Sequence, residues 1–115
     1  MDNLTVVTQQ YHDRTVITVA GEMDLHTCPA LRDATSVIPP DDKALHLEMS
    51  GVSFMDSSGI NLLLQLHLRL LGEGRQLVID GLRDQPTQVL LLTGAYDVLV
   101  PSSAAAPDTA GFGPA

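Results

Sequence analysis

The chain has 115 residues, of which 44% are hydrophobic and 3% aromatic, so a single domain with an aliphatic core is expected. Six basic and fourteen acidic side chains give a formal net charge of -8. This charge repels phosphate backbones and anionic lipid, and aromatic platforms for stacking single-stranded bases are scarce. We therefore expect neither nucleic acid nor a membrane as partner, which leaves a protein or a small ligand.

The single cysteine, Cys28, cannot form an intrachain disulfide, which is compatible with a reducing compartment. No basic residue flanks it closely, so we expect a buried, unreactive side chain in a helix. The N-terminus lacks the charged and apolar segments of a signal peptide, and every leucine-rich stretch is interrupted before it could span a bilayer. These features predict a cytoplasmic protein.

Runs of β-branched and aliphatic residues predict four strands. Leu4–Thr8 and Thr15–Val19 are expected to pair across a polar turn, with Gly21 ending the second strand. In Ala44–Met49, Leu and Met side chains alternate with His46 and Glu48, and Gln76–Ile79 supplies the fourth strand. Residues 50–56 are expected to form a loop with Val52 and Phe54 as apolar anchors.

The first predicted helix begins near Asp24 or Thr27, either of which could be its N-cap. Pro29 is tolerated in its first turn, and the helix is expected to continue to about Ile38 before Pro39 and Pro40 end it. A last helix is expected from near Pro86 to Thr93, with Gly94 as its C-terminal cap.

The central predicted helix runs from Ser57 to about Leu71 and is closed by Gly72 and Gly74. At about 100° per residue, Asn61, Gln65 and Arg69 fall on one narrow face. The other faces are apolar, so the helix should be largely buried through Ile60, Leu63, Leu64, Leu66, Leu70 and Leu71.

This order of elements predicts an α/β domain with a mixed sheet of four to five strands. The opening pair is antiparallel, and the strand-helix-strand crossovers that follow favour parallel pairing with right-handed connections and helices mainly on one face. The domain is expected to occupy residues 1–100. Residues 101–115 are rich in Ala, Pro, Ser and Gly and are predicted to be a disordered tail.

The segment Asp56-Ser57-Ser58-Gly59 lies where a loop enters the central helix. A serine there can serve simply as a helix cap, since its hydroxyl can accept a backbone hydrogen bond. It can also be a phosphoacceptor, because the positive end of the helix dipole stabilises a phosphate group. Position alone leaves both interpretations of Ser57 open.

Three motifs resemble the STAS domain of bacterial anti-sigma-factor antagonists, over about Leu4 to Leu99. They are Gly21-Glu22-Met23-Asp24 after a strand, Leu47–Val52 leading into Ser53-Phe54-Met55-Asp56-Ser57-Ser58-Gly59, and Leu92-Thr93-Gly94. The Phe-Met-Asp-Ser-Ser-Gly run is the specific one. The run Gln88–Leu92 departs from the family, where charged residues are common, so either an apolar edge is exposed there or the helix register differs from this prediction.

The resemblance implies partner switching. In the family, the unmodified antagonist binds an anti-sigma factor that is itself a serine kinase and so releases a sigma factor. Phosphorylation by that kinase ends the binding, and a serine phosphatase restores it. The family's phosphoacceptor corresponds to Ser57, and the partner-binding surface to Asp24, Asp56, Ser58, Gly59, Asn61 and Gln65, extended by Arg69. For Asp24, a helix cap remains an equal alternative.

Enzymatic and nucleotide-binding functions have little support in the sequence. The segment Met55–Gly59 is not the G-x-S-x-G elbow of a serine hydrolase, and the four histidines show no zinc spacing, so we predict no enzyme, no cofactor and no metal. Gly72–Arg75 follows a helix instead of opening one, which argues against a phosphate-binding loop. The serious alternative is a constitutive STAS scaffold or transporter-associated binding module in which Ser57 is never phosphorylated.

Overall fold

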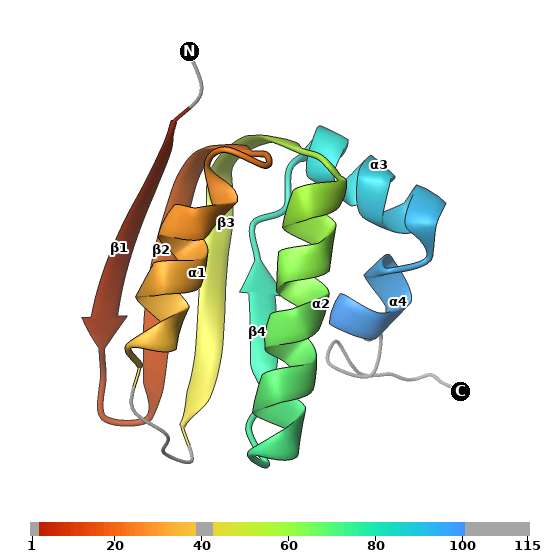
Figure 1. Cartoon of the computed structure of the whole chain (residues 1–115). Coiled ribbons are helices and arrows are strands. Elements are labelled where there is room, and N and C mark those ends of the chain that lie inside the picture. Colours follow the sequence, from red (N-terminus) through yellow and green to blue (C-terminus); the bar gives the residue numbers. More distant parts are fainter. Residues whose placement is uncertain (1–2, 39–42, 101–115) are drawn as a thin grey trace.

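The computed structural model describes residues 3–38 and 43–100, which form one four-stranded sheet with helices packed on it (Figure 1). The strand order is β1-β2-β3-β4, with β1 antiparallel to β2 and the other pairs parallel. This confirms the predicted mixed α/β sheet. The strands are β1 Leu4–Gln10, β2 Arg14–Met23, β3 Ala44–Met55 and β4 Leu77–Asp80. The helices are α1 Cys28–Ser36, α2 Ser57–Gly72, α3 Asp84–Thr93 and α4 Tyr96–Leu99.

The helices cover one face of the sheet, as predicted. Helices α1 and α2 lie side by side over this face, and α3 and α4 lie beyond α2 (Figure 1). Alternate side chains of the two central strands point under the helices and are fully or almost fully buried, which places the core there. These core side chains are Ile17, Val19, Leu45, Leu47 and Met49.

Three strands are longer than predicted, and β1 continues past Thr8 to Gln10. Gly21 does not end β2, because its φ of 118° lets the chain bend against the start of β1 and continue to Met23. A Cβ at position 21 would lie 2.2 Å from the Asn3 carbonyl oxygen. Strand β3 continues to Met55, so the predicted loop over residues 50–56 is also wrong. Of its two expected anchors, Val52 is buried but Phe54 is 40% exposed.

The three predicted helices correspond to α1, α2 and α3, but some of their ends were predicted inexactly. Helix α1 ends at Ser36, two residues short of Ile38, while Pro39 and Pro40 lie outside the described residues. Gly94 caps α3 in the left-handed conformation, as predicted. The short helix α4 was not predicted. The tail 101–115 also lies outside the described residues.

Burial agrees with most of the side chains assigned to the core. Cys28 is buried at the first position of α1, as expected. Leu71 was expected inside but is 61% exposed, because it shares with Leu68, which is 64% exposed, a face of α2 that points away from the core. Leu91 and Leu92 are 56% and 85% exposed, so the apolar run of α3 does present an exposed edge.

Candidate functional site

The junction between β3 and α2 positions the predicted switch serine. Asp56 is the N-cap of α2, and its carboxylate accepts a hydrogen bond from the Ser58 N–H at 2.9 Å. The Asp56 N–H donates to the Met23 carbonyl at 3.0 Å, which ties the junction to the end of β2. The capping role that was one interpretation of Ser57 therefore belongs to Asp56.

Ser57 is the first residue of α2 and its side chain is exposed. Within residues 3–38 and 43–100, the Ser57 hydroxyl has no hydrogen-bond partner, whereas Ser58 beside it is half-buried. The hydroxyl at position 57 is thus accessible to another protein and lies at the positive end of a helix of 16 residues.

The first turn of α2 is packed tightly on the ends of β2 and β3. A Cβ at Gly59 would lie 2.7 Å from Met55 Cγ and 3.2 Å from Met23 Cβ. Gly59 is buried, so the structure places this member of the predicted partner-binding set beneath the surface. Its lack of a side chain lets the helix approach the sheet and fixes where Ser57 emerges.

Gln85, which the sequence did not single out, fixes the same junction from α3. Its Oε1 accepts from the Met55 N–H at 2.8 Å, and its Nε2 donates to the Met55 carbonyl at 3.1 Å. The Gln85 amide thus makes the two hydrogen bonds with the Met55 backbone that a neighbouring strand would otherwise make. Because 30 residues separate the two positions, no local sequence pattern could have indicated this contact.

Asp24 organises the turn between β2 and α1. Its Oδ1 accepts from the N–H groups of His26 and Thr27 at 2.9 and 3.0 Å. The Thr27 hydroxyl in turn donates to the Glu22 carbonyl at 2.5 Å. The N-cap of α1 is Thr27, so Asp24 is not the helix cap, and its half-buried carboxylate instead orders the turn that precedes the helix.

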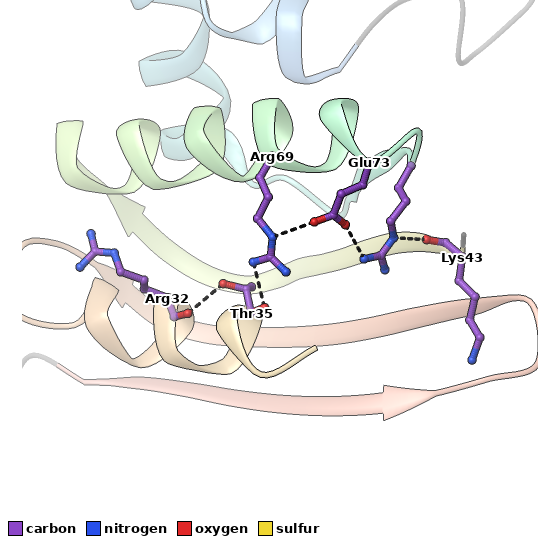
Figure 2. Close-up of polar contacts among 6 residues, drawn as sticks. Arg32, Thr35, Lys43, Arg69 and Glu73 are labelled. Atoms are coloured by element: carbon purple, nitrogen blue, oxygen red, sulfur yellow. Dashed lines mark hydrogen bonds and ion pairs between the residues drawn. The ribbon is translucent and has the colours of Figure 1, made fainter. Parts of the chain in front are cut away.

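Three predicted residues form one stripe along α2. Ser57, Asn61 and Gln65 are four residues apart and all are exposed, so they share a face of the helix. Arg69 does not extend this stripe. Its guanidinium is turned toward α1, donates to the Thr35 carbonyl at 3.0 Å and lies 3.5 Å from Glu73 Oε2 (Figure 2). The Arg69 side chain is 37% exposed, but its guanidinium is bound by the C-terminus of α1 and is not free on the exposed face.

A protein-family model described as "Mlab, STAS domain" matches residues 6–101, which is most of the chain. The chain belongs to the STAS domain family. The resemblance inferred from its motifs is therefore confirmed.

The relatives of this STAS domain include anti-sigma factor antagonists. The anti-sigma-B factor antagonist of Listeria monocytogenes is 31% identical over 88 residues, covering 76% of this chain and 77% of that protein. The Bacillus subtilis anti-sigma-B factor antagonist is 24% identical over 97 residues, covering 84% and 89%. The crystal structure of an anti-sigma factor antagonist from Mycobacterium paratuberculosis matches with a TM-score of 0.68 and 28% identity, covering 86% of both chains.

Charged side chains near the start of α2 act on the pKa of the buried Cys28 thiol. Burial raises the pKa of Cys28, and the carboxylates of Asp56 and Asp24 raise it further. Arg32, one turn along α1, acts in the opposite direction on the same pKa. The two predicted partner-binding carboxylates therefore act on the same point beside the start of α2.

The described part of the STAS domain contains neither a cluster of metal-ligating side chains nor a membrane-spanning helix. No group of three His, Cys, Asp or Glu side chains there could hold a metal ion. None of its helices is long and apolar enough to cross a membrane. His46 lies on the face of the sheet away from α1 and α2, with Nδ1 3.5 Å from Asp80 Oδ2, and lines a surface hollow with Asp13, Arg14, Val16, Glu48 and Asp80.

Proposed function

We propose that this STAS domain is an anti-sigma factor antagonist that acts in the cytoplasm and is switched off by phosphorylation of Ser57. In the unphosphorylated state it binds an anti-sigma factor that is also a serine kinase, and a sigma factor is released. The proposal is supported by the curated relatives, which are named anti-sigma-B factor antagonists. The structural observation that carries it is the exposed, unbonded hydroxyl of Ser57 at the first position of α2.

A phosphate on Ser57 would alter the surface without disturbing the core. The side chain is exposed, and Asp56 already caps the helix, so modification breaks no described contact of Ser57. The helix dipole favours a negative group at this position. The fold that presents Ser57 to a kinase should therefore persist after phosphorylation.

The same phosphate would weaken docking of a partner. It adds roughly 1.5 to 2 negative charges beside Asp56 in a chain whose formal net charge is already -8. We propose that the partner contacts Asp24, Asp56, Ser58 and the Asn61–Gln65 part of the α2 stripe, with Gly59 supporting them from below. A partner surface complementary to carboxylates and a neutral hydroxyl would then meet a bulky dianion.

Phosphorylation by a candidate anti-sigma factor kinase from the same organism tests the switch directly. With radiolabelled ATP, we expect one phosphate to be added to the wild-type chain and to Ser58→Ala, but none to Ser57→Ala. Ser58→Ala is the matched control because it removes a neighbouring hydroxyl. Equal labelling of Ser57→Ala would refute the assignment, and binding without any labelling would instead support a constitutive binding module.

Binding measured by calorimetry tests the consequence of the switch. We expect the phosphorylated chain and Ser57→Asp to bind the anti-sigma factor more weakly than wild type, and treatment with a serine phosphatase to restore the affinity of the phosphorylated chain. Unchanged affinity after complete phosphorylation would contradict the electrostatic mechanism.

A further inference from the structure

A small groove between α1 and α2 adjoins the end of the exposed stripe. It has a volume of about 160 Å³, well below the roughly 300 to 1,000 Å³ typical of small-molecule sites. It therefore has room for one side chain of another protein. The groove is lined by Leu62, Gln65, Leu66 and Arg69 from α2 and by Arg32, Thr35 and Ser36 from α1.

One of the two guanidinium groups of this groove is already engaged. Arg69 donates to the Thr35 carbonyl and lies beside Glu73, whose other oxygen accepts from Arg75 Nη1 at 3.1 Å. Arg75 is buried and donates from Nε to the Lys43 carbonyl at 2.8 Å, so the chain of contacts continues to the start of β3 (Figure 2). Arg69 thus joins α1 and α2, and its charge is compensated by Glu73.

The other guanidinium group, that of Arg32, is not engaged. Its backbone carbonyl accepts a hydrogen bond from the Thr35 hydroxyl at 2.9 Å. The side chain is exposed, and across residues 3–38 and 43–100 its guanidinium makes no hydrogen bond or ion pair. Figure 2 shows it turned away from Arg69, toward the end of α2 that carries Ser57.

The charge of the groove is opposite to that of the molecule. None of its lining residues is acidic, although acidic side chains outnumber basic ones by fourteen to six in the chain. A free guanidinium offers parallel N–H donors whose geometry matches a carboxylate. The apolar floor formed by Leu62 and Leu66, both almost fully buried, would exclude water from such a pair and strengthen it.

We propose that the groove between α1 and α2 is a second docking point for the protein partner, and that Arg32 there binds an aspartate or glutamate side chain of that partner. This inference rests on the proposed function and specifies the chemistry of its partner. The docking surface then carries charges of both signs, with the Asp24 and Asp56 carboxylates near Ser57 and Arg32 lining the groove together with Gln65. Such a pattern fixes the orientation in which the partner binds.

The test is the affinity of the anti-sigma factor for charge variants of the full chain. We expect Arg32→Ala to weaken binding about tenfold and Arg32→Glu about a hundredfold, with a smaller salt dependence of the association rate for both. Arg14→Ala is the matched control, because it removes the same charge from the first residue of β2, where Arg14 pairs with Asp13. It should change the affinity by less than about twofold, as expected for a charge outside the docking surface.

The outcomes separate this inference from the proposed function. If the wild-type chain binds no anti-sigma factor, the proposed function fails. If it binds and Arg32→Ala binds equally well, the function stands and the role of Arg32 is refuted. Rescue of Arg32→Glu by one acidic-to-arginine change on the partner would confirm the pair. A different result would overturn the proposal. If Arg32→Ala binds the partner as well as wild type, and the substitution lowers the melting temperature only of the Ser57-phosphorylated chain, Arg32 interacts with the phosphate and not with the partner.

Discussion

The two ends of α2 use polar side chains for different purposes. At the N-terminal end, Ser57 and Asn61 are exposed and the backbone is held by Asp56 and Gln85. At the C-terminal end, Arg69 is bound to the Thr35 carbonyl and to Glu73. Four-residue spacing along a helix places side chains on one face, but the neighbouring elements decide whether that face is free to bind a partner. Here α1 binds Arg69, the next polar residue of α2 at this spacing.

The largest effect is expected where α2 starts against the sheet. Gly59→Val should destabilise the fold by about 3 kcal/mol, because the added methyl groups would overlap Met55 and Met23. Gly72→Val at the other end meets open space and should change the free energy of unfolding by less than about 1 kcal/mol. Urea denaturation of both variants measures the difference. Equal destabilisation would show that the two ends are packed alike.

Removing Arg69 should have the next largest effect. Arg69→Ala breaks the hydrogen bond to the α1 carbonyl and the contact with Glu73, and we expect a loss of about 1.5 to 2 kcal/mol in the free energy of unfolding. Gln65→Ala, one turn earlier on the exposed stripe, should cost less than about 0.5 kcal/mol. If Gln65→Ala proved as destabilising as Arg69→Ala, the proposed difference between the exposed Gln65 and the bound Arg69 would be wrong.

The helix cap should contribute less. Asp56→Ala removes the acceptor of the Ser58 N–H and should destabilise the chain by about 1 kcal/mol, whereas Asp56→Asn retains an acceptor and should cost only a few tenths. Thermal unfolding of the two variants provides the comparison. A full loss in Asp56→Asn would mean that the charge of Asp56, and not the hydrogen bond, is what stabilises the start of α2.

The smallest effect concerns the electrostatics beside Ser57. Asp56→Asn should lower the pKa of the Cys28 thiol, and Arg32→Ala should raise it, because the carboxylate disfavours the thiolate and the guanidinium favours it. A pH titration of the Cys28 Cβ chemical shift measures both. Shifts in the opposite directions would contradict this placement of the charges.

The raised pKa of Cys28 also predicts how stability depends on pH. Since the folded-state pKa is raised, the folded chain disfavours the thiolate, and the free energy of unfolding should fall as the pH rises above the unfolded pKa near 9.0.

Local chemistry in the sequence was enough to predict the order of most elements. Alternating apolar residues indicated the central strands, Gly94 indicated the end of α3, and the Phe-Met-Asp-Ser-Ser-Gly run indicated both the start of α2 and the family. These signals depend on side-chain period and on backbone conformation within a few residues. The exposure of Ser57, Asn61 and Gln65 also agrees with the helical period.

Contacts between distant segments decided the rest. Gly21 looked like a strand end, but its packing against Asn3 allows β2 to continue, and pairing with β2 carries β3 to Met55 through what local signals indicated as a loop. Gln85 could not be connected with Met55, nor Arg69 with Thr35, because these bonds join residues 30 and 34 positions apart. The sequence alone thus determined which residues are polar and on which helical face they lie. Only the tertiary structure decided which of them are free, because a hydrogen bond or ion pair with a distant segment occupies a side chain that would otherwise face solvent.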